Sequence, residues 1–250
     1  MQITAIILAK NEESRIKEAI HTVSFCDDIL VVDDESTDKT NEIVNKAGAR
    51  FMTHPKNNEF AGQRNWAMEQ AKHEWILFID ADEVVSEDLR AEIEHVVKQK
   101  QSEIVVYFIP RRDFFWNHEM KYGETKKART TGIVRLMKKG SGIWAGSVHE
   151  VFLPAGKTGT LKGYINHTSH TSLVDFIEDV NVYSTMRAEE LQKQGKQATV
   201  FELIFYPFGK FIYTYFIQRG FLDGPAGFVY SFVMSFHSFL VRAKLLVNTI

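Results

Sequence analysis

Residues 75–83 read Trp-Ile-Leu-Phe-Ile-Asp-Ala-Asp-Glu, an apolar run that ends in a cluster of carboxylates. A segment of this length that is apolar on both faces is typical of a parallel strand covered by helices. Asp80 and Asp82 lie two positions apart, so both carboxylates can address the same side of the sheet edge as the strand ends. This stretch predicts a buried central strand with polar chemistry at its carboxyl end.

Short apolar segments and segments of helical spacing alternate through the first hundred residues. The predicted strands are residues 3–8, 29–33, 50–53 and 75–80, and the predicted helices are residues 13–23, 38–47 and 60–72. Ser36, Thr37 or Asp38 can cap the second helix, and Ser86 can cap a further one. This alternation indicates right-handed βαβ units and an α/β fold with a parallel sheet, in which ligands bind beyond the carboxyl ends of the strands.

The remainder of the chain has two different patterns. Residues 104–164 combine short strands with glycine-rich turns, which predicts a mixed second part of the sheet with long loops over the site. Residues 173–194 have the spacing of an amphipathic helix, and the segment after them is crowded with aromatic side chains. We expect this last segment to form a helical C-terminal region.

Composition excludes several classes of protein. The 250 residues are 44% hydrophobic and 25% charged, as in folded globular proteins, and the net charge of −2 argues against broad binding to nucleic acid. Cys26 is the single cysteine, so no intrachain disulfide is expected, which suits a reducing compartment. Residues 1–10 lack the pattern of a signal peptide and are expected to contain the first strand.

The aromatic C-terminal segment is also basic. Residues 195–250 contain five basic and two acidic residues, whereas the rest of the chain has a net charge of −5. Residues 200–218 and 221–241 are long enough to cross a bilayer, but charged residues and prolines interrupt them. Aromatic and basic residues on one helix favour a location at a membrane surface. The alternative is a helical appendage packed on the α/β part of the chain, or an oligomer interface.

Three predicted strands end in acidic residues. The sequences at these ends are Ala9-Lys10-Asn11-Glu12, residues 33–38 and Asp80-Ala81-Asp82-Glu83. Carboxylates repel phosphates, but they bind them through a bridging Mg²⁺ or Mn²⁺, which takes oxygen ligands from protein and substrate together. The strand ends therefore predict a metal-assisted phosphate site, and solvated turns are the alternative interpretation.

These blocks resemble the three donor-site blocks of family 2 glycosyltransferases, which have the GT-A fold. The blocks are residues 6–13, 31–38 and 79–83, and residues 144–150 and 220–224 resemble the subgroup that includes lipopolysaccharide-core β-1,4-glucosyltransferases. The resemblance implies an inverting transfer of a hexose from a nucleotide-diphosphate donor, such as a UDP-sugar, to a lipid-linked or lipopolysaccharide-core glycan. It also implies a GT-A-like, mixed and centrally parallel sheet flanked by helices.

The resemblance assigns roles to residues of the three blocks. Glu12 and Asp34 are expected to contact the uracil and ribose, with Asp33 nearby, and Asp80 and Asp82 to hold the ribose and the metal-bound diphosphate. The sequence Gln63-Arg64-Asn65 is similar to the helix that relatives place beside the nucleotide. Arg64 is therefore expected to contact the diphosphate or the base, with a solvated surface arginine as the alternative.

Two further groups of residues are candidates for the donor site. His167, in the sequence His-Thr-Ser-His, is a candidate third metal ligand beside Asp82 and Asp80, or a loop histidine without such a role. The basic stretch that contains Lys126, Lys127, Arg129 and Arg135 is a candidate for neutralising the leaving diphosphate, or a solvated face.

The acceptor side departs from the common family pattern. Many members carry a Glu-Asp pair whose Asp is the catalytic base, whereas this chain has His149-Glu150 in that region. Inverting transfer needs a base for the acceptor hydroxyl, and we expect Glu150 in this role, with His149 as the alternative or as an orienting neighbour. A structural pair in a loop is the remaining interpretation.

We therefore expect a catalytic domain at residues 1–170, with a nucleotide-sugar half at 1–100 and an acceptor half at 101–170, followed by a helical region at 171–250. The enzyme is expected to be cytoplasmic and peripheral on the inner face of the cell membrane, with an oligomer possible through the aromatic segment. A sugar nucleotidyltransferase would carry a glycine-rich loop after the first strand, which is absent, and a non-catalytic membrane scaffold would not need acidic strand ends.

Overall fold

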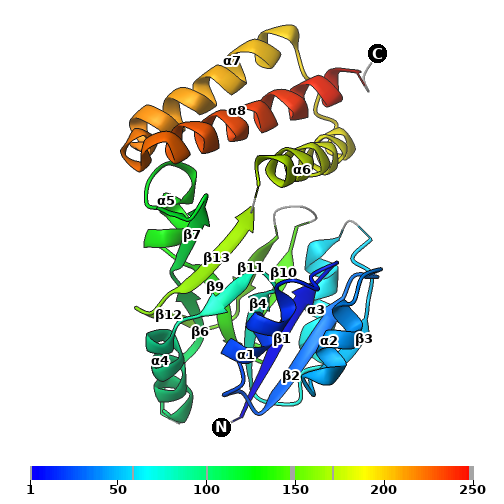
Figure 1. Ribbon diagram of the computed structural model, residues 1–250, viewed down its shortest axis with the longest axis vertical. Helices are drawn as coiled ribbons and strands as arrows, with labels where there is room; N and C mark the ends of the chain where they lie inside the picture. The colour runs from blue at the N-terminus through cyan, green and yellow to red at the C-terminus, as the bar shows by residue number, and fades with distance from the viewer. Residues whose placement is uncertain (1, 58, 100, 147–149, 171, 248–250) are drawn as a thin grey trace. The chain divides into compact units, whose positions relative to one another are not determined.

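The computed structural model describes residues 2–57, 59–99, 101–146, 150–170 and 172–247, except the side chain of Ser169 (Figure 1). They form two compact units, each of which is discontinuous in sequence. The first comprises residues 1–111 and 130–167, and the second comprises residues 112–129 and 168–250.

A seven-stranded sheet forms the centre of the first unit, in the order β12-β6-β9-β4-β1-β2-β3. Strand β1 pairs in parallel with β2 and β4, and β2 pairs in parallel with β3, whereas β9 is antiparallel to both β4 and β6. The sheet is thus mixed and centrally parallel, which confirms the predicted α/β class. The strands are β1 (Ile3–Ala9), β2 (Asp28–Asp33), β3 (Arg50–Thr53), β4 (Trp75–Asp80), β6 (Ile104–Ile109), β9 (Ile133–Lys138) and β12 (Lys157–Thr160).

Helices cover both faces of this sheet, which explains why its central strands are apolar throughout. On β4, Leu77 and Ile79 belong to one hydrophobic cluster with residues of helices α1 (Ile16–Thr22) and α4 (Glu87–Lys98). Ile76 and Phe78 belong to the other cluster, with Ala67 and Met68 of α3 (Phe60–Glu69). Alternate side chains of a strand point to opposite faces, so two covered faces require a continuous apolar run.

Helices α1 and α2 (Thr40–Lys46) begin two or three residues later than predicted because the two preceding loops bind each other. Ser36 Oγ accepts a hydrogen bond from Asn11 N at 2.7 Å, and Asp38 Oδ2 accepts one from Glu13 N at 2.9 Å. These side chains are therefore not at the cap position of α2, where Lys39 makes no side-chain cap bond. The prediction for Ser86 is confirmed, since its hydroxyl accepts from Leu89 N at the start of α4.

Two strand pairs complete the first unit. Strand β5 (Glu83–Val85) pairs antiparallel with the start of β13 (Ile165–His170), in a register that sets His167 opposite Glu83. Strands β10 (Gly142–Ala145) and β11 (Val151–Pro154) form an antiparallel pair. The first of these pairs brings β13 beside the residues that follow β4.

The second unit is mainly helical. Helices α6 (Leu173–Lys193) and α7 (Val200–Phe211) pack against α8 (Gly224–Val247), and Phe176, Val180 and Val233 share a core cluster. This confirms an apolar, aromatic-rich helical C-terminal region. The smaller elements that lie wholly in this unit, or all but one residue of which do, are β7 (Arg111–Phe115), β8 (His118–Met120), η1 (Gly123–Thr125), α5 (Lys126–Thr130), η2 (Ile212–Ile217) and η3 (Gly220–Asp223).

The loop that precedes β13 packs on α4, and this contact gives a test of the fold. A Cβ atom on Gly163 would lie 2.5 Å from Leu89 Cα, and Glu92 Oε2 holds the loop through Lys162 N and Gly163 N at 2.8 and 2.9 Å. We expect Gly163→Ala to lower the free energy of unfolding by about 1–3 kcal/mol, because the overlap is with backbone. Urea denaturation measures this.

Gly62 on α3 is the matched control, since its added Cβ would meet its nearest atom at 3.5 Å. Gly62→Ala should be neutral or should stabilise the protein by up to about 1 kcal/mol, because alanine favours a helix. Equal losses in both variants would contradict the described packing of the loop.

Candidate active site

The three acidic strand ends meet at one edge of the sheet. Strands β1, β2 and β4 are parallel neighbours, and their register places Ala9 beside Asp33 and Leu8 beside Asp80. The loops that carry Glu12, Asp34 and Asp82 therefore leave the sheet from the same edge, as expected from the sequence.

Asp80 lies at the centre of this edge, between two arginines. Arg64 Nη2 donates to Asp80 Oδ1 at 3.1 Å, and Arg135 Nη2 donates to Asp80 Oδ2. Burial by itself raises the pKa of Asp80, but the charges of Arg135 and Arg64 outweigh it and hold the pKa far below its usual range. The two arginines therefore favour the ionised form of Asp80.

The buried Glu83 binds both Asp80 and Arg135. Its side chain is fully buried, its Oε2 accepts from Asp80 N at 3.1 Å, and its Oε1 accepts from Arg135 Nη2 at 2.7 Å. Arg111 Nη1 lies 3.5 Å from the same Oε1. No role for Glu83 or Arg111 follows from the sequence; the available signal is Glu83 as a third acidic residue directly after Asp80-Ala81-Asp82.

Arg64 joins this edge of the sheet to the segment that contains Glu150. Its Nε donates to Glu150 Oε1 at 2.9 Å, and its guanidinium lies over the rings of Phe78 and Trp144, 5.4 and 4.9 Å from their centroids. The residue is only 5% exposed, so the alternative of a solvated surface arginine is wrong. Neighbouring Asn65 holds helix α3 to the β10–β11 pair through two 2.9 Å hydrogen bonds with the backbone of Trp144.

The two arginines retain unused hydrogen-bonding capacity. Arg64 Nη1 and Arg135 Nε are buried and have no hydrogen-bond partner among the described residues. A buried donor without a partner is costly, so such atoms are expected at a site that a ligand completes.

Asp82, two residues after Asp80, pairs with His167. His167 Nε2 lies 3.3 Å from Asp82 Oδ2, and the two side chains are 13% and 19% exposed. Burial raises the pKa of Asp82, but the adjacent His167 outweighs it and lowers that pKa. Within the described ranges no group of three or more His, Cys, Asp or Glu residues is arranged to hold a metal ion, so this pair offers two ligands.

Asp34 is held by two lysines. Lys10 Nζ lies 3.0 Å from Asp34 Oδ2, Lys56 Nζ lies 3.6 Å from the same oxygen, and Lys56 N donates to Oδ1 at 2.9 Å. Although burial raises the pKa of Asp34, the hydrogen bonds and charges of Lys56 and Lys10 lower it overall. The structure thus holds the carboxylate of Asp34 at this edge of the sheet, between two lysines.

Asp33 and Glu12 are the remaining carboxylates of this edge. Asp33 is 2% exposed, its Oδ2 accepts from Ser36 N at 2.8 Å, and its Oδ1 is buried without a described hydrogen-bond partner. Glu12 receives two hydrogen bonds from Arg15, at 2.8 and 3.0 Å. Burial raises the pKa of Glu12 in spite of this arginine.

The structure separates the basic stretch between residues 126 and 135. Arg135 on β9 reaches Asp80, whereas Arg129 pairs with Glu119 within the second unit. Lys126 and Lys127 are exposed on α5. The described residues include Glu150 but not His149, so the choice between these two as base stays a prediction.

The fold and this edge define an α/β enzyme of the GT-A type. Residues 4–148 match the model of Glycosyl transferase family 2, and the chain belongs to this family. It is similar to an uncharacterized glycosyltransferase of Rickettsia typhi, with 31% identity over 98% of this chain and 86% of that protein. The lipopolysaccharide core biosynthesis glycosyltransferase LpsC of Rhizobium meliloti is also 31% identical, over 98% of this chain and 92% of that protein.

A solved structure supports the same fold. The glucosyl-3-phosphoglycerate synthase of Mycobacterium tuberculosis, in complex with Mn²⁺, UDP and phosphoglyceric acid, aligns with a TM-score of 0.52. The identity is 13%, and the alignment covers 79% of this chain and 80% of that chain. The family match thus shows a glycosyltransferase, and this likeness shows that it has the expected fold.

The buried Glu83 provides a test of the charge network. Glu83→Gln would leave Arg135 and Arg111 facing one charge fewer in a buried site, and we expect a loss of about 3–5 kcal/mol in unfolding free energy. The control is Glu74→Gln, because Glu74 pairs with Lys138 at 2.8 Å while half exposed. That change should cost no more than about 1 kcal/mol by chemical denaturation. Similar losses in the two variants would show that Glu83 does not support the network.

Proposed function

We propose that the enzyme transfers a hexose, with inversion, from a UDP-sugar to a lipid-linked or lipopolysaccharide-core glycan, with the help of Mg²⁺ or Mn²⁺. The observation that carries this proposal is the bridge that Arg64 makes between Asp80 and Glu150. It connects the carboxylates of the donor edge with a carboxylate of the segment that the family uses for the acceptor.

The balance of charges at the edge supports the use of a divalent cation. Three carboxylates, Asp80, Glu83 and Glu150, face three guanidinium groups of Arg64, Arg135 and Arg111. This network has no surplus positive charge to offset the negative charge of a nucleotide diphosphate. An added cation would supply it.

The residues beside the network fit such a cation. The carboxylate of Asp82 and the imidazole of His167 are ligand types that Mn²⁺ accepts, and diphosphate oxygens and water can complete the coordination. Asp80 is engaged by both arginines, so we assign it to positioning and to the ribose more than to the metal. When bound, the metal acts as a Lewis acid for the departing UDP. The Mycobacterium tuberculosis structure, which contains Mn²⁺ and UDP, supports this proposal.

We assign the other steps, namely deprotonation of the acceptor and binding of the donor, to side chains of the protein. Glu150, or His149, removes the proton of the acceptor hydroxyl, whose oxygen forms a bond to the anomeric carbon as the bond from that carbon to UDP breaks on the opposite face. Arg64 Nη1 and Arg135 Nε offer unused donors to phosphate oxygens. Asp33 Oδ1, Asp34 and Glu12 provide acceptors for the uracil N–H and ribose hydroxyls.

The proposed place of action is the cytoplasmic face of the cell membrane, where a lipid-linked acceptor would be presented. The similarity to LpsC, which is named for lipopolysaccharide core biosynthesis, supports this acceptor class. Among the residues that the structure describes, the second unit contains one helical stretch, residues 220–247, that is long and apolar enough to cross a membrane by length and composition. A third of the 18-residue window that meets this criterion is buried.

Metal-assisted donor binding can be tested by thermal unfolding. At a UDP-sugar concentration of about 100 times Kd, we expect the melting temperature to rise by about 5–10 °C in the presence of Mn²⁺, since a ligand that binds only the folded state stabilises it. Asp82→Ala should abolish the dependence on Mn²⁺. Asp88→Ala, an exposed carboxylate in the first turn of α4, is the control and should respond like the unchanged protein. A metal-dependent shift that persists in Asp82→Ala would contradict the assignment.

The role of Glu150 is separable from donor binding. Glu150→Gln keeps a hydrogen-bond acceptor for Arg64 Nε but removes the base, so we expect the donor Kd to stay within about threefold while kcat falls by about 10²–10⁴-fold. Calorimetry and a coupled UDP-release assay measure the two quantities. If His149→Ala shows this loss and Glu150→Gln does not, the base is His149.

A further inference from the structure

Helix α7 and the η2 turn that continues it present an apolar face that the second unit does not cover. None of the residues of α7 is buried. Side chains spaced as one helical face are between 50% and 67% exposed, namely Val200, Phe201, Ile204, Phe205 and Phe208. Phe216 and Ile217 of η2 add 51% and 66% exposure. An exposed apolar surface of this extent marks an interaction site.

The opposite side of α7 holds the helix against the rest of the second unit. Thr214 is buried, and Ser235 on α8 donates a hydrogen bond to Pro207 O. Lys210 Nζ forms an ion pair with Glu124 at 2.7 Å. Because polar contacts hold this side against the unit, the exposed side is the one available to a partner.

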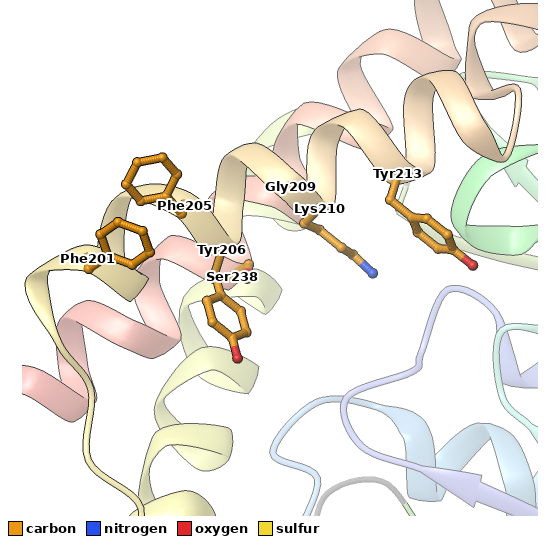
Figure 2. Close-up of a pocket in the computed structure, with 7 residues that line it drawn as sticks. All are labelled: Phe201, Phe205, Tyr206, Gly209, Lys210, Tyr213 and Ser238. Atoms are coloured by element: carbon orange, nitrogen blue, oxygen red, sulfur yellow. The ribbon is translucent and has the colours of Figure 1, made fainter.

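A groove of about 510 Å³ runs beside the exposed face, between α7 and Ser238 of α8 (Figure 2). Phe201, Phe205 and the side-chain-free Gly209 line it, and Tyr206, Lys210 and Tyr213 extend to the same side of α7 in Figure 2. Aromatic rings with a polar tip are favoured where hydrocarbon meets water, since the ring and the hydroxyl prefer different surroundings.

Positive charge flanks the apolar face at both ends. Lys193 and Lys196 precede α7, and Arg219 follows η2, all three exposed. The only acidic residue between positions 193 and 222 is Glu202, whose carboxylate is used by Thr199 N at 2.9 Å to cap α7. Helix α6, in contrast, carries five acidic and two basic residues. The charge of the α7 side is thus complementary to an anionic surface.

We infer that α7 and η2 form a monotopic docking surface for an anionic phospholipid bilayer. The apolar face enters the acyl region of one leaflet, and the flanking cations contact the headgroups. This inference rests on the proposed function in one respect: contact with the bilayer would give the enzyme access to a lipid-linked acceptor. A second copy of the chain is a poorer occupant, because pairing two α7 helices in either direction brings cations together at both ends.

Helix α8 stays in the unit and does not cross the bilayer. Ala226 and Val233 share a core cluster with Phe176 and Val180 of α6, and Leu245 shares another with Ala188. Crossing would remove these contacts and would also expose buried Asp223, which accepts hydrogen bonds from Lys121 N and Tyr122 N.

Vesicle sedimentation tests the docking surface. The full chain should bind vesicles of phosphatidylcholine with a quarter phosphatidylglycerol at least about tenfold more tightly than pure phosphatidylcholine at low salt, and alkaline carbonate should release it. Phe201→Ser with Phe205→Ser should weaken binding by at least about thirtyfold, because two large apolar side chains are lost. Val174→Ser with Val182→Ser on α6, exposed by 64% and 55%, is the matched control and should stay within about twofold. Circular dichroism confirms that both variants are folded.

Other outcomes would overturn the inference. The inference is wrong if the chain binds both kinds of vesicle equally, or if the Phe201/Phe205 variant binds as tightly as the unchanged protein. It is also wrong if the protein stays on the vesicles after carbonate extraction, or if light scattering shows a dimer that this variant disrupts. UDP release with a soluble acceptor sugar is measured on the same samples and should be unchanged in both variants. Absence of turnover in the unchanged enzyme would count against the proposed function alone, since vesicle binding is measured without donor.

Discussion

The site depends on one carboxylate, Asp80, which is shared between two buried guanidinium groups. Arg135 comes from β9 and Arg64 from α3, so the pair connects the central strand β4 with an antiparallel strand and with a helix on one face of the sheet. Burying charges is costly unless they are paired and hydrogen-bonded, and Glu83 supplies the second anion that Arg135 needs. The result is a charge-balanced edge, beside which Asp82 and His167 form a second pair.

This separation gives two neighbouring aspartates different surroundings. Asp80 faces arginines and Asp82 faces a histidine, although only Ala81 lies between them in sequence. Two guanidinium partners already compensate the charge of a carboxylate, which disfavours the binding of a cation there. A carboxylate beside an imidazole instead offers one oxygen and one nitrogen ligand type. The two carboxylates of the acidic motif therefore lie in different electrostatic surroundings.

Much of the fold follows from the local pattern of the chain. The first four strands lie within one residue of their predicted bounds because two covered faces demand continuous apolar runs. Helix starts were less accurate, because Asn11, Ser36 and Asp38 form bonds between two loops that are remote in sequence. Glu83 and Arg111 have no role that is visible in the sequence for a similar reason: each stands beside other charged residues, and which charges pair is decided only when the strands are paired.

The sequence by itself determined the α/β class, the acidic ends of β1, β2 and β4, the family and the aromatic character of the C-terminal helices. These features are local, since they depend on periodicity and on short motifs. Only the tertiary structure decided that Arg64 is buried between Phe78 and Trp144, that it joins Asp80 to Glu150, and which side of α7 remains exposed. Such contacts join residues 16 to 86 positions apart, and their geometry exists only after the sheet and helices have packed.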